Sequence, residues 1–76
     1  MQFQRAIINE EGVTYAIVTV EQETLNSKTE REGVRQLFES IYKKIPLILQ
    51  TNGNNGIINY EGRTDIIDYL KASMLQ

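Results

Sequence analysis

The chain has 76 residues, with eight Lys and Arg against ten Asp and Glu, so its formal net charge is −2. A chain this short forms one small domain, placed at residues 1–76, and its pattern divides into two similar halves at roughly 1–45 and 46–76. It contains no cysteine and no histidine, which excludes disulfides, thiol or imidazole catalysis and zinc sites built on those ligands. A small core without such supports makes association with a second copy a reasonable expectation.

Apolar runs in this chain are short. The run from Ile45 to Leu49 falls far below the ~20 residues that a membrane-spanning helix needs. The N-terminus also lacks the apolar block of a signal peptide. We therefore expect a soluble, cytoplasmic protein with no membrane partner.

The first 21 residues predict a β-hairpin. Residues 3–9 and 13–21 are rich in β-branched and aromatic side chains, and Glu10-Glu11-Gly12 separates them. Gly12 suits the left-handed position that closes such a turn. The second strand is apolar on both faces, which is typical of a central strand.

A helix is predicted after residue 26, where the apolar spacing changes to i, i+3, i+4, i+7, i+11. The residues with this spacing are Val34, Leu37, Phe38, Ile41 and Ile45. Two pairs, Ser27 with Glu30 and Thr29 with Glu32, each have the spacing of an N-terminal capping box, and Pro46 ends the helix.

The second half repeats the pattern of hairpin and helix. Residues 47–51 and 57–61 predict two strands around a turn at 52–56, and a helix follows at about 64–75. Thr64 is the candidate N-cap of this helix. Its shared apolar face is formed by Ile66, Ile67, Leu70 and Met74.

The predicted fold class is therefore α+β with the order ββαββα, a four-stranded antiparallel sheet with two helices packed on one face. Such a sheet leaves its other face open, with either Tyr15 and Ile17 or Ala16 and Val18 of the second strand on it. We nominate Tyr15, Ile17 and Thr19 as the candidate interface there. We expect a small non-enzymatic binding module that contacts a protein partner or forms a homo-oligomer, most simply a homodimer, through this face.

The loop that contains Asn52, Gly53, Asn54 and Asn55 has two interpretations. Asn and Gly tolerate positive φ angles, so an ordinary hairpin turn explains them. Their amides also make the loop a candidate site for a polar small molecule, whose identity stays unknown. The loop lacks the Gly-Lys-Ser/Thr ending of a P-loop.

Basic side chains on the first helix give an alternative function. Arg31, Arg35, Lys43 and Lys44 are candidate contacts of a nucleic-acid-associated regulator. Interleaved glutamates largely cancel their field, so nucleic acid is not the partner we expect.

An enzyme would need carboxylates with a metal, or lysine chemistry, and Glu61, Asp65 and Asp68 form the only plausible cluster. Acidic residues in a first helical turn are also favoured by the helix dipole alone. We therefore expect no catalytic residue, no metal and no cofactor.

The last 30 residues carry one family resemblance. Pro46-Leu47-Ile48-Leu49, a glycine turn, Tyr60-Glu61-Gly62-Arg63-Thr64 and Ile66-Ile67-Asp68-Tyr69-Leu70 are similar to the closing ββα unit of thioredoxin-like domains. The first βα unit of that family and its Cys-x-x-Cys motif have no counterpart here. No redox residue is therefore carried over, and we do not assign the chain to that family.

Overall fold

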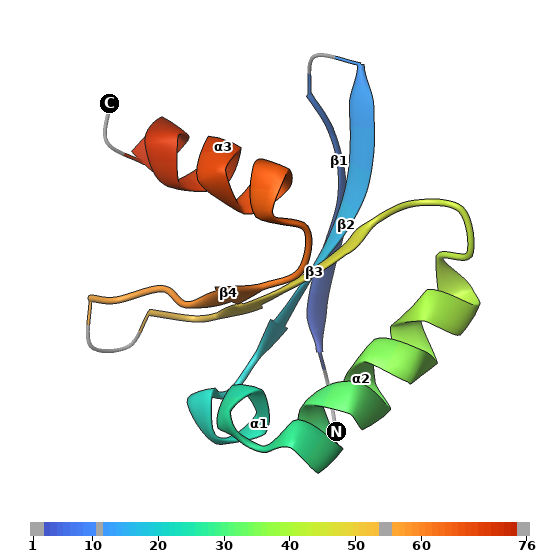
Figure 1. Ribbon diagram of the computed structural model, residues 1–76, viewed down its shortest axis with the longest axis vertical. Helices are drawn as coiled ribbons and strands as arrows, with labels where there is room; N and C mark the ends of the chain where they lie inside the picture. The colour runs from blue at the N-terminus through green and yellow to red at the C-terminus, as the bar shows by residue number, and fades with distance from the viewer. Residues whose placement is uncertain (1–2, 11, 54–55, 75–76) are drawn as a thin grey trace.

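The computed structural model describes residues 3–10, 12–53 and 56–74 (Figure 1). Within these residues the predicted α+β class and the order of the predicted strands and helices are confirmed, but a short additional helix that the sequence did not predict precedes the first predicted helix. The elements are β1 (Gln4–Glu10), β2 (Val13–Val20), α1 (Gln22–Asn26), α2 (Lys28–Ile41), β3 (Leu47–Thr51), β4 (Tyr60–Glu61) and α3 (Thr64–Met74).

The sheet is mixed, with the strand order β1-β2-β3-β4. β1 and β2 are antiparallel, and so are β3 and β4, but β2 and β3 run parallel with Ala16 opposite Leu47 and Val20 opposite Thr51. The expectation of a purely antiparallel sheet is therefore wrong for the central pair. The chain leaves the end of β2, crosses over through α1 and α2, and enters β3 in the same direction, as a parallel connection requires.

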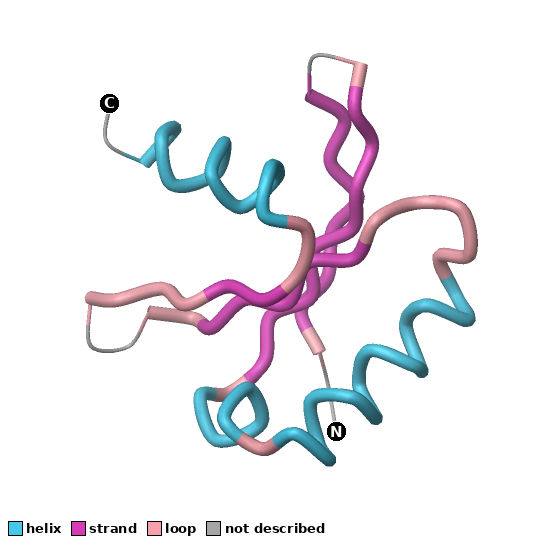
Figure 2. Tube along the Cα trace, viewed as in Figure 1, coloured by secondary structure: helices cyan, strands magenta, loops and turns pink. Residues whose placement is uncertain are grey.

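Helices cover both faces of the sheet. Phe38 of α2 packs with Val18 and Leu49 on one face, whereas Ile66 of α3 packs with Tyr15 and Ile48 on the other. Figures 1 and 2 show α3 on the opposite side of the strands from α1 and α2. The prediction of two helices on one face is therefore wrong, because the side chains of β2 and β3 are apolar on both faces and each apolar face has to be buried.

Local signals fix several element boundaries. The hydroxyl of Ser27 accepts a hydrogen bond from the backbone N–H of Glu30 at 3.3 Å, so Ser27 is the N-cap of α2 and the alternative candidate Thr29 is not. Gly12 has a φ of 81°, the left-handed conformation expected at the hairpin turn. The helix α2 ends at Ile41, one turn before the predicted stop at Pro46.

The turn between β4 and α3 lies directly against β3. Gly62 has a φ of 150°, and a Cβ atom there would lie 2.8 Å from the carbonyl oxygen of Leu47 and 2.7 Å from Cδ1 of Ile48. Backbone and core atoms therefore leave no room for a side chain at position 62. This close approach positions α3 over its face of the sheet.

We predict that Gly62→Ala lowers the free energy of unfolding by at least about 2 kcal/mol, through backbone strain and steric overlap. Gly33→Ala is the matched control: Gly33 lies within α2, nothing surrounds its Cβ position within 4 Å, and the φ of that residue is not positive. This variant should gain about 0.5–1 kcal/mol from helix propensity. Denaturant unfolding of both variants measures the difference, and equal stabilities would contradict the close packing at Gly62.

Candidate interaction surfaces

The face proposed from the sequence as an open interface is covered by α3. The side chain of Tyr15 is only 2% exposed, and Ile17 is half-buried in the same cluster as Ile66. Thr19 is also half-buried and accepts a hydrogen bond from the side-chain amide of Gln50 at 3.2 Å. The expectation of an open sheet face is therefore wrong at Tyr15 and Ile17, because α3 supplies the second apolar layer over them.

The environment of Tyr15 is that of a core-edge tyrosine. Burial, followed by the nearby charge of Glu10, raises the pKa of the Tyr15 hydroxyl above its ordinary value. The residue lines a small cavity of about 150 Å³, together with Ile66 and Tyr69 among others. The hydroxyl of Tyr69 donates to the carboxylate of Glu10 at 3.1 Å, which ties α3 to the end of β1.

Two of the four predicted nucleic-acid contacts hold the fold together. Arg31 donates to the carbonyl oxygen of Leu25 at 2.9 Å. Arg35 donates to the side chain of Glu61, to the carbonyl oxygen of Glu61 at 3.2 Å and to that of Leu47 at 3.4 Å. Their guanidinium groups are therefore engaged within the protein, whereas Lys43 and Lys44 are exposed beyond the end of α2.

The three carboxylates proposed for an enzyme are not brought together into a metal site. Glu61 pairs with Arg35, and Asp65 pairs with Arg63 at 2.6 Å, while Asp68 is exposed. The Arg63 guanidinium holds the pKa of the Asp65 carboxyl below its ordinary value, mainly through its hydrogen bond. Among the described residues no group of three potential metal ligands is present.

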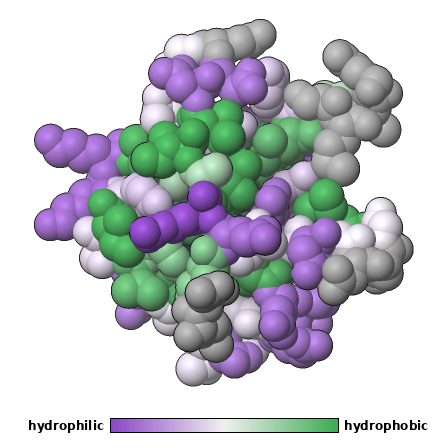
Figure 3. Space-filling view, turned by 180° about the vertical axis from the view of Figure 1, so that it is seen from behind, coloured by the Kyte–Doolittle hydropathy of each residue, from purple (hydrophilic) through white to green (hydrophobic). Residues whose placement is uncertain are grey.

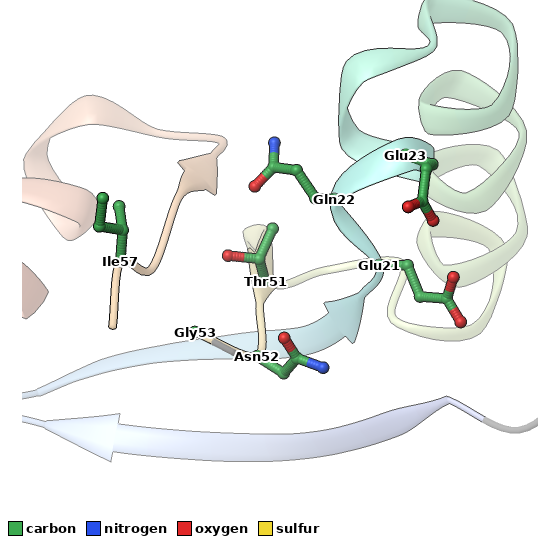
Figure 4. Close-up of a pocket in the computed structure, with 7 residues that line it drawn as sticks. All are labelled: Glu21, Gln22, Glu23, Thr51, Asn52, Gly53 and Ile57. Atoms are coloured by element: carbon green, nitrogen blue, oxygen red, sulfur yellow. The ribbon is translucent and has the colours of Figure 1, made fainter. Parts of the chain in front are cut away.

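A polar pocket of about 470 Å³ lies at the carboxyl ends of the parallel strands β2 and β3 (Figure 4). It includes Asn52 and Gly53 of the predicted polar loop, whereas Asn54 and Asn55 lie outside the described residues. Its lining comes from the residue after β2 and the start of α1, from the end of β3 and the two residues after it, and from one residue further along the loop. These residues are Glu21, Gln22, Glu23, Thr51, Asn52, Gly53 and Ile57.

Several polar groups of this pocket are used to hold its own walls. The hydroxyl of Thr51 accepts from the backbone N–H of Asn59 at 2.9 Å, and the side-chain oxygen of Gln22 accepts from the side-chain amide of Asn59 at 2.7 Å. The first bond joins the segment before β4 to β3, and the second joins it to α1. Thr51 and Gln22 therefore use polar groups of the pocket wall to hold the fold.

The outer edge of β1 is a surface that the sequence did not single out. β1 lies at one end of the sheet and, within the part of the chain that the structure describes, pairs only with β2. The backbone N–H of Ala16 donates to the carbonyl oxygen of Pro46 at 2.9 Å, so the peptide groups of Ala16 point toward β3. Because the direction of the peptide groups alternates along a strand, the backbone N–H and C=O groups of Tyr15 and Ile17 point toward β1. They pair there with the backbone groups of Ile8 and Ala6.

The intervening residues of β1 consequently point their peptide groups away from the sheet. These residues are Arg5, Ile7 and Asn9. Each presents an N–H donor and a C=O acceptor along the outer edge. The edge is thus a row of backbone groups that suits the addition of another strand.

Exposed apolar side chains lie beside this edge. Ile7 is 58% exposed, and Leu37 and Ile41 of α2 are 51% and 50% exposed. Leu37 and Ile41 were predicted on the buried stripe of the helix, but the stripe that packs against the core is Val34, Phe38, Tyr42 and Ile45. If Tyr42 is counted as an apolar residue, the sequence itself indicates the stripe Val34, Phe38, Tyr42 and Ile45.

Geometry places Leu37 and Ile41 on the β1 side of α2. Arg35 reaches Leu47 and Glu61, so it marks the flank toward β3 and β4. At 100° per residue, Leu37 and Ile41 fall on the other flank of the helix. The guanidinium of Arg5 on β1 lies 5.8 Å from the ring of Phe38, so this part of α2 borders the edge strand.

We define the β1 edge surface as the outer edge of Gln4–Glu10 together with Ile7, Leu37 and Ile41. In the view from behind, Figure 3 shows hydrophobic side chains exposed in several patches with hydrophilic ones between them.

In the described part of the chain, no helix has the length and apolar character needed to cross a membrane. The chain matches no model of a known protein family, and neither the curated proteins nor the solved structures contain a match.

Arg35 provides a test of the structural role assigned to it. Arg35→Gln should lower the free energy of unfolding by about 1.5–3 kcal/mol, because the partly buried Glu61 and the carbonyl oxygen of Leu47 lose a charged donor. The control Arg63→Gln removes a solvent-exposed pair and should leave stability unchanged. Thermal or denaturant unfolding measures both, and equal stability of the two variants would argue against a structural role for Arg35.

Proposed function

We propose that this protein is a small non-enzymatic interaction module that binds another polypeptide along the β1 edge surface. One observation carries the proposal: β1 is an edge strand of seven residues whose outward peptide groups belong to Arg5, Ile7 and Asn9. An extended segment of a partner can hydrogen-bond to these groups and continue the sheet. This mode of binding replaces the open sheet face that the sequence predicted.

The side chains beside the edge support the same role. Ile7, Leu37 and Ile41 together offer apolar contact area next to the backbone row. In strand addition, main-chain hydrogen bonds supply affinity and neighbouring side-chain contacts supply selectivity. An edge strand that carried only charged residues would instead oppose such pairing.

A binding role also agrees with how the charged residues are used. Glu61 and Asp65 take part in ion pairs, and Arg31 and Arg35 hydrogen-bond within the protein. These contacts favour a structural interpretation of the residues that the enzyme and nucleic-acid hypotheses rely on. The proposed role of the β1 edge surface does not depend on these four charged residues.

Site-specific photo-crosslinking tests the proposal. A benzophenone amino acid placed at position 7 should form a covalent adduct with a protein in the native host, because Ile7 lies at the centre of the contact. The same group at position 57 is the control, since Ile57 is equally exposed at 59% but lies outside β1. No adduct at position 7, or the same adducts at both positions, would contradict a role for the β1 edge.

A further inference from the structure

We propose that the partner at the β1 edge surface is a second copy of this chain, with the two β1 strands antiparallel and the two Ile7 residues facing each other across a two-fold axis. The proposal rests on the function proposed above and specifies its partner. Two four-stranded sheets would then join into one continuous sheet.

The register follows from the outward peptide groups. Only Arg5, Ile7 and Asn9 point outward within β1, and Ile7 is the middle residue of Gln4–Glu10. Centring the pair on Ile7 places Ile7 opposite Ile7 and Arg5 opposite Asn9 in both directions. All three outward residues of each copy then have partners, and each pair exchanges two hydrogen bonds.

Other registers satisfy fewer groups. A shift of one residue would set outward peptide groups against inward ones and reverse the side-chain faces. A shift of two residues in either direction leaves only two fully bonded pairs within the strand. The centred register is therefore the one that uses the whole edge.

Charges and side chains fit this register. On the α2 face, Arg5 of one copy faces the neutral Asn9 of the other; on the α3 face, Gln4 faces Glu10. No like charges stand directly opposite within Gln4–Glu10, an arrangement that would destabilise a strand pair. Ala6 meets Ile8, a small residue against a larger half-buried one.

The two-fold axis also brings the exposed flanks of α2 to the same side. The axis is perpendicular to the sheet, so the α2 helices of both copies lie on one face and border the new strand pair. Leu37 and Ile41, exposed on the β1 side of each α2 helix, then lie on the same face of the joined sheet as the central pair of Ile7 side chains. One arrangement thereby partners the unpaired backbone row and encloses the exposed apolar residues next to it.

Single-cysteine variants test the register, because the natural chain contains no cysteine. In the proposed register, residues 7 and 7 and residues 5 and 9 form hydrogen-bonded pairs. The Cα atoms of such pairs lie about 5.5 Å apart, within the Cα range that a disulfide spans. Under mild oxidation, Ile7→Cys should form a covalent dimer at least tenfold faster than the equally exposed control Ile57→Cys. An equimolar mixture of Arg5→Cys and Asn9→Cys should give mainly the mixed dimer, and this second design keeps Ile7 intact.

Sedimentation of the unmodified chain at high micromolar concentration supplies the independent measurement, with a dimer mass expected. A monomer at that concentration, or equal crosslinking rates at positions 7 and 57, would overturn the proposed homodimer. Photo-crosslinking at position 7 distinguishes the two proposals: an adduct with a different protein would overturn the homodimer and leave the interaction function standing. The absence of any specific adduct would remove the interaction function itself.

Discussion

Burial of both faces of the two central strands is the constraint on which the rest of the fold depends. Val18 and Leu49 face α2, whereas Ile48 faces α3, and all three are fully buried. A helix on one side alone would leave an apolar face of β2 and β3 in water, at about 25 cal/mol for each Å² of apolar surface exposed. The chain therefore has to place α3 opposite α2, and it does so through the close turn at Gly62.

This arrangement moves the available contact surface from a face of the sheet to its edge. With helices on both sides of β2 and β3, Tyr15 becomes a core residue and loses its predicted interface role. β1 is paired on one side only, and its outward peptide groups and Ile7 lie where a further strand would add. The short chain has enough helix to cover both central faces, and the edge of β1 is a surface that this covering leaves available.

Much of the local structure could be predicted from the sequence, since caps and turns are specified by neighbouring residues. The N-cap at Ser27, the left-handed Gly12 and the two-faced β2 strand were all predictable in this way. The direction of β3 was not, because a buried apolar strand has the same composition in a parallel pair as in an antiparallel one. The face covered by α3 was equally undetermined, since its apolar stripe fits either side of the sheet.

The candidate site was less predictable because it depends on contacts distant in sequence. Arg35 was proposed as a nucleic-acid contact, yet its partner Glu61 lies 26 residues away. Asn52 and Gly53 do line a pocket, as the polar loop suggested, but the use of its polar groups in holding α1 is a tertiary property. Which peptide groups of β1 point outward could be inferred only from the hydrogen bond between Ala16 and Pro46 on the other side of β2.

Amide hydrogen exchange along β1, followed by NMR at low and high protein concentration, tests this account most directly. In dilute solution the amide of Ile8 should be protected by its pairing with β2, and the neighbouring amide of Ile7 should exchange rapidly. At high concentration the amides of Arg5, Ile7 and Asn9 should become protected together. Protection of the Ile7 amide in dilute solution would contradict an open β1 edge. Exchange at Ile7 that does not depend on protein concentration would contradict pairing of this edge with a second copy.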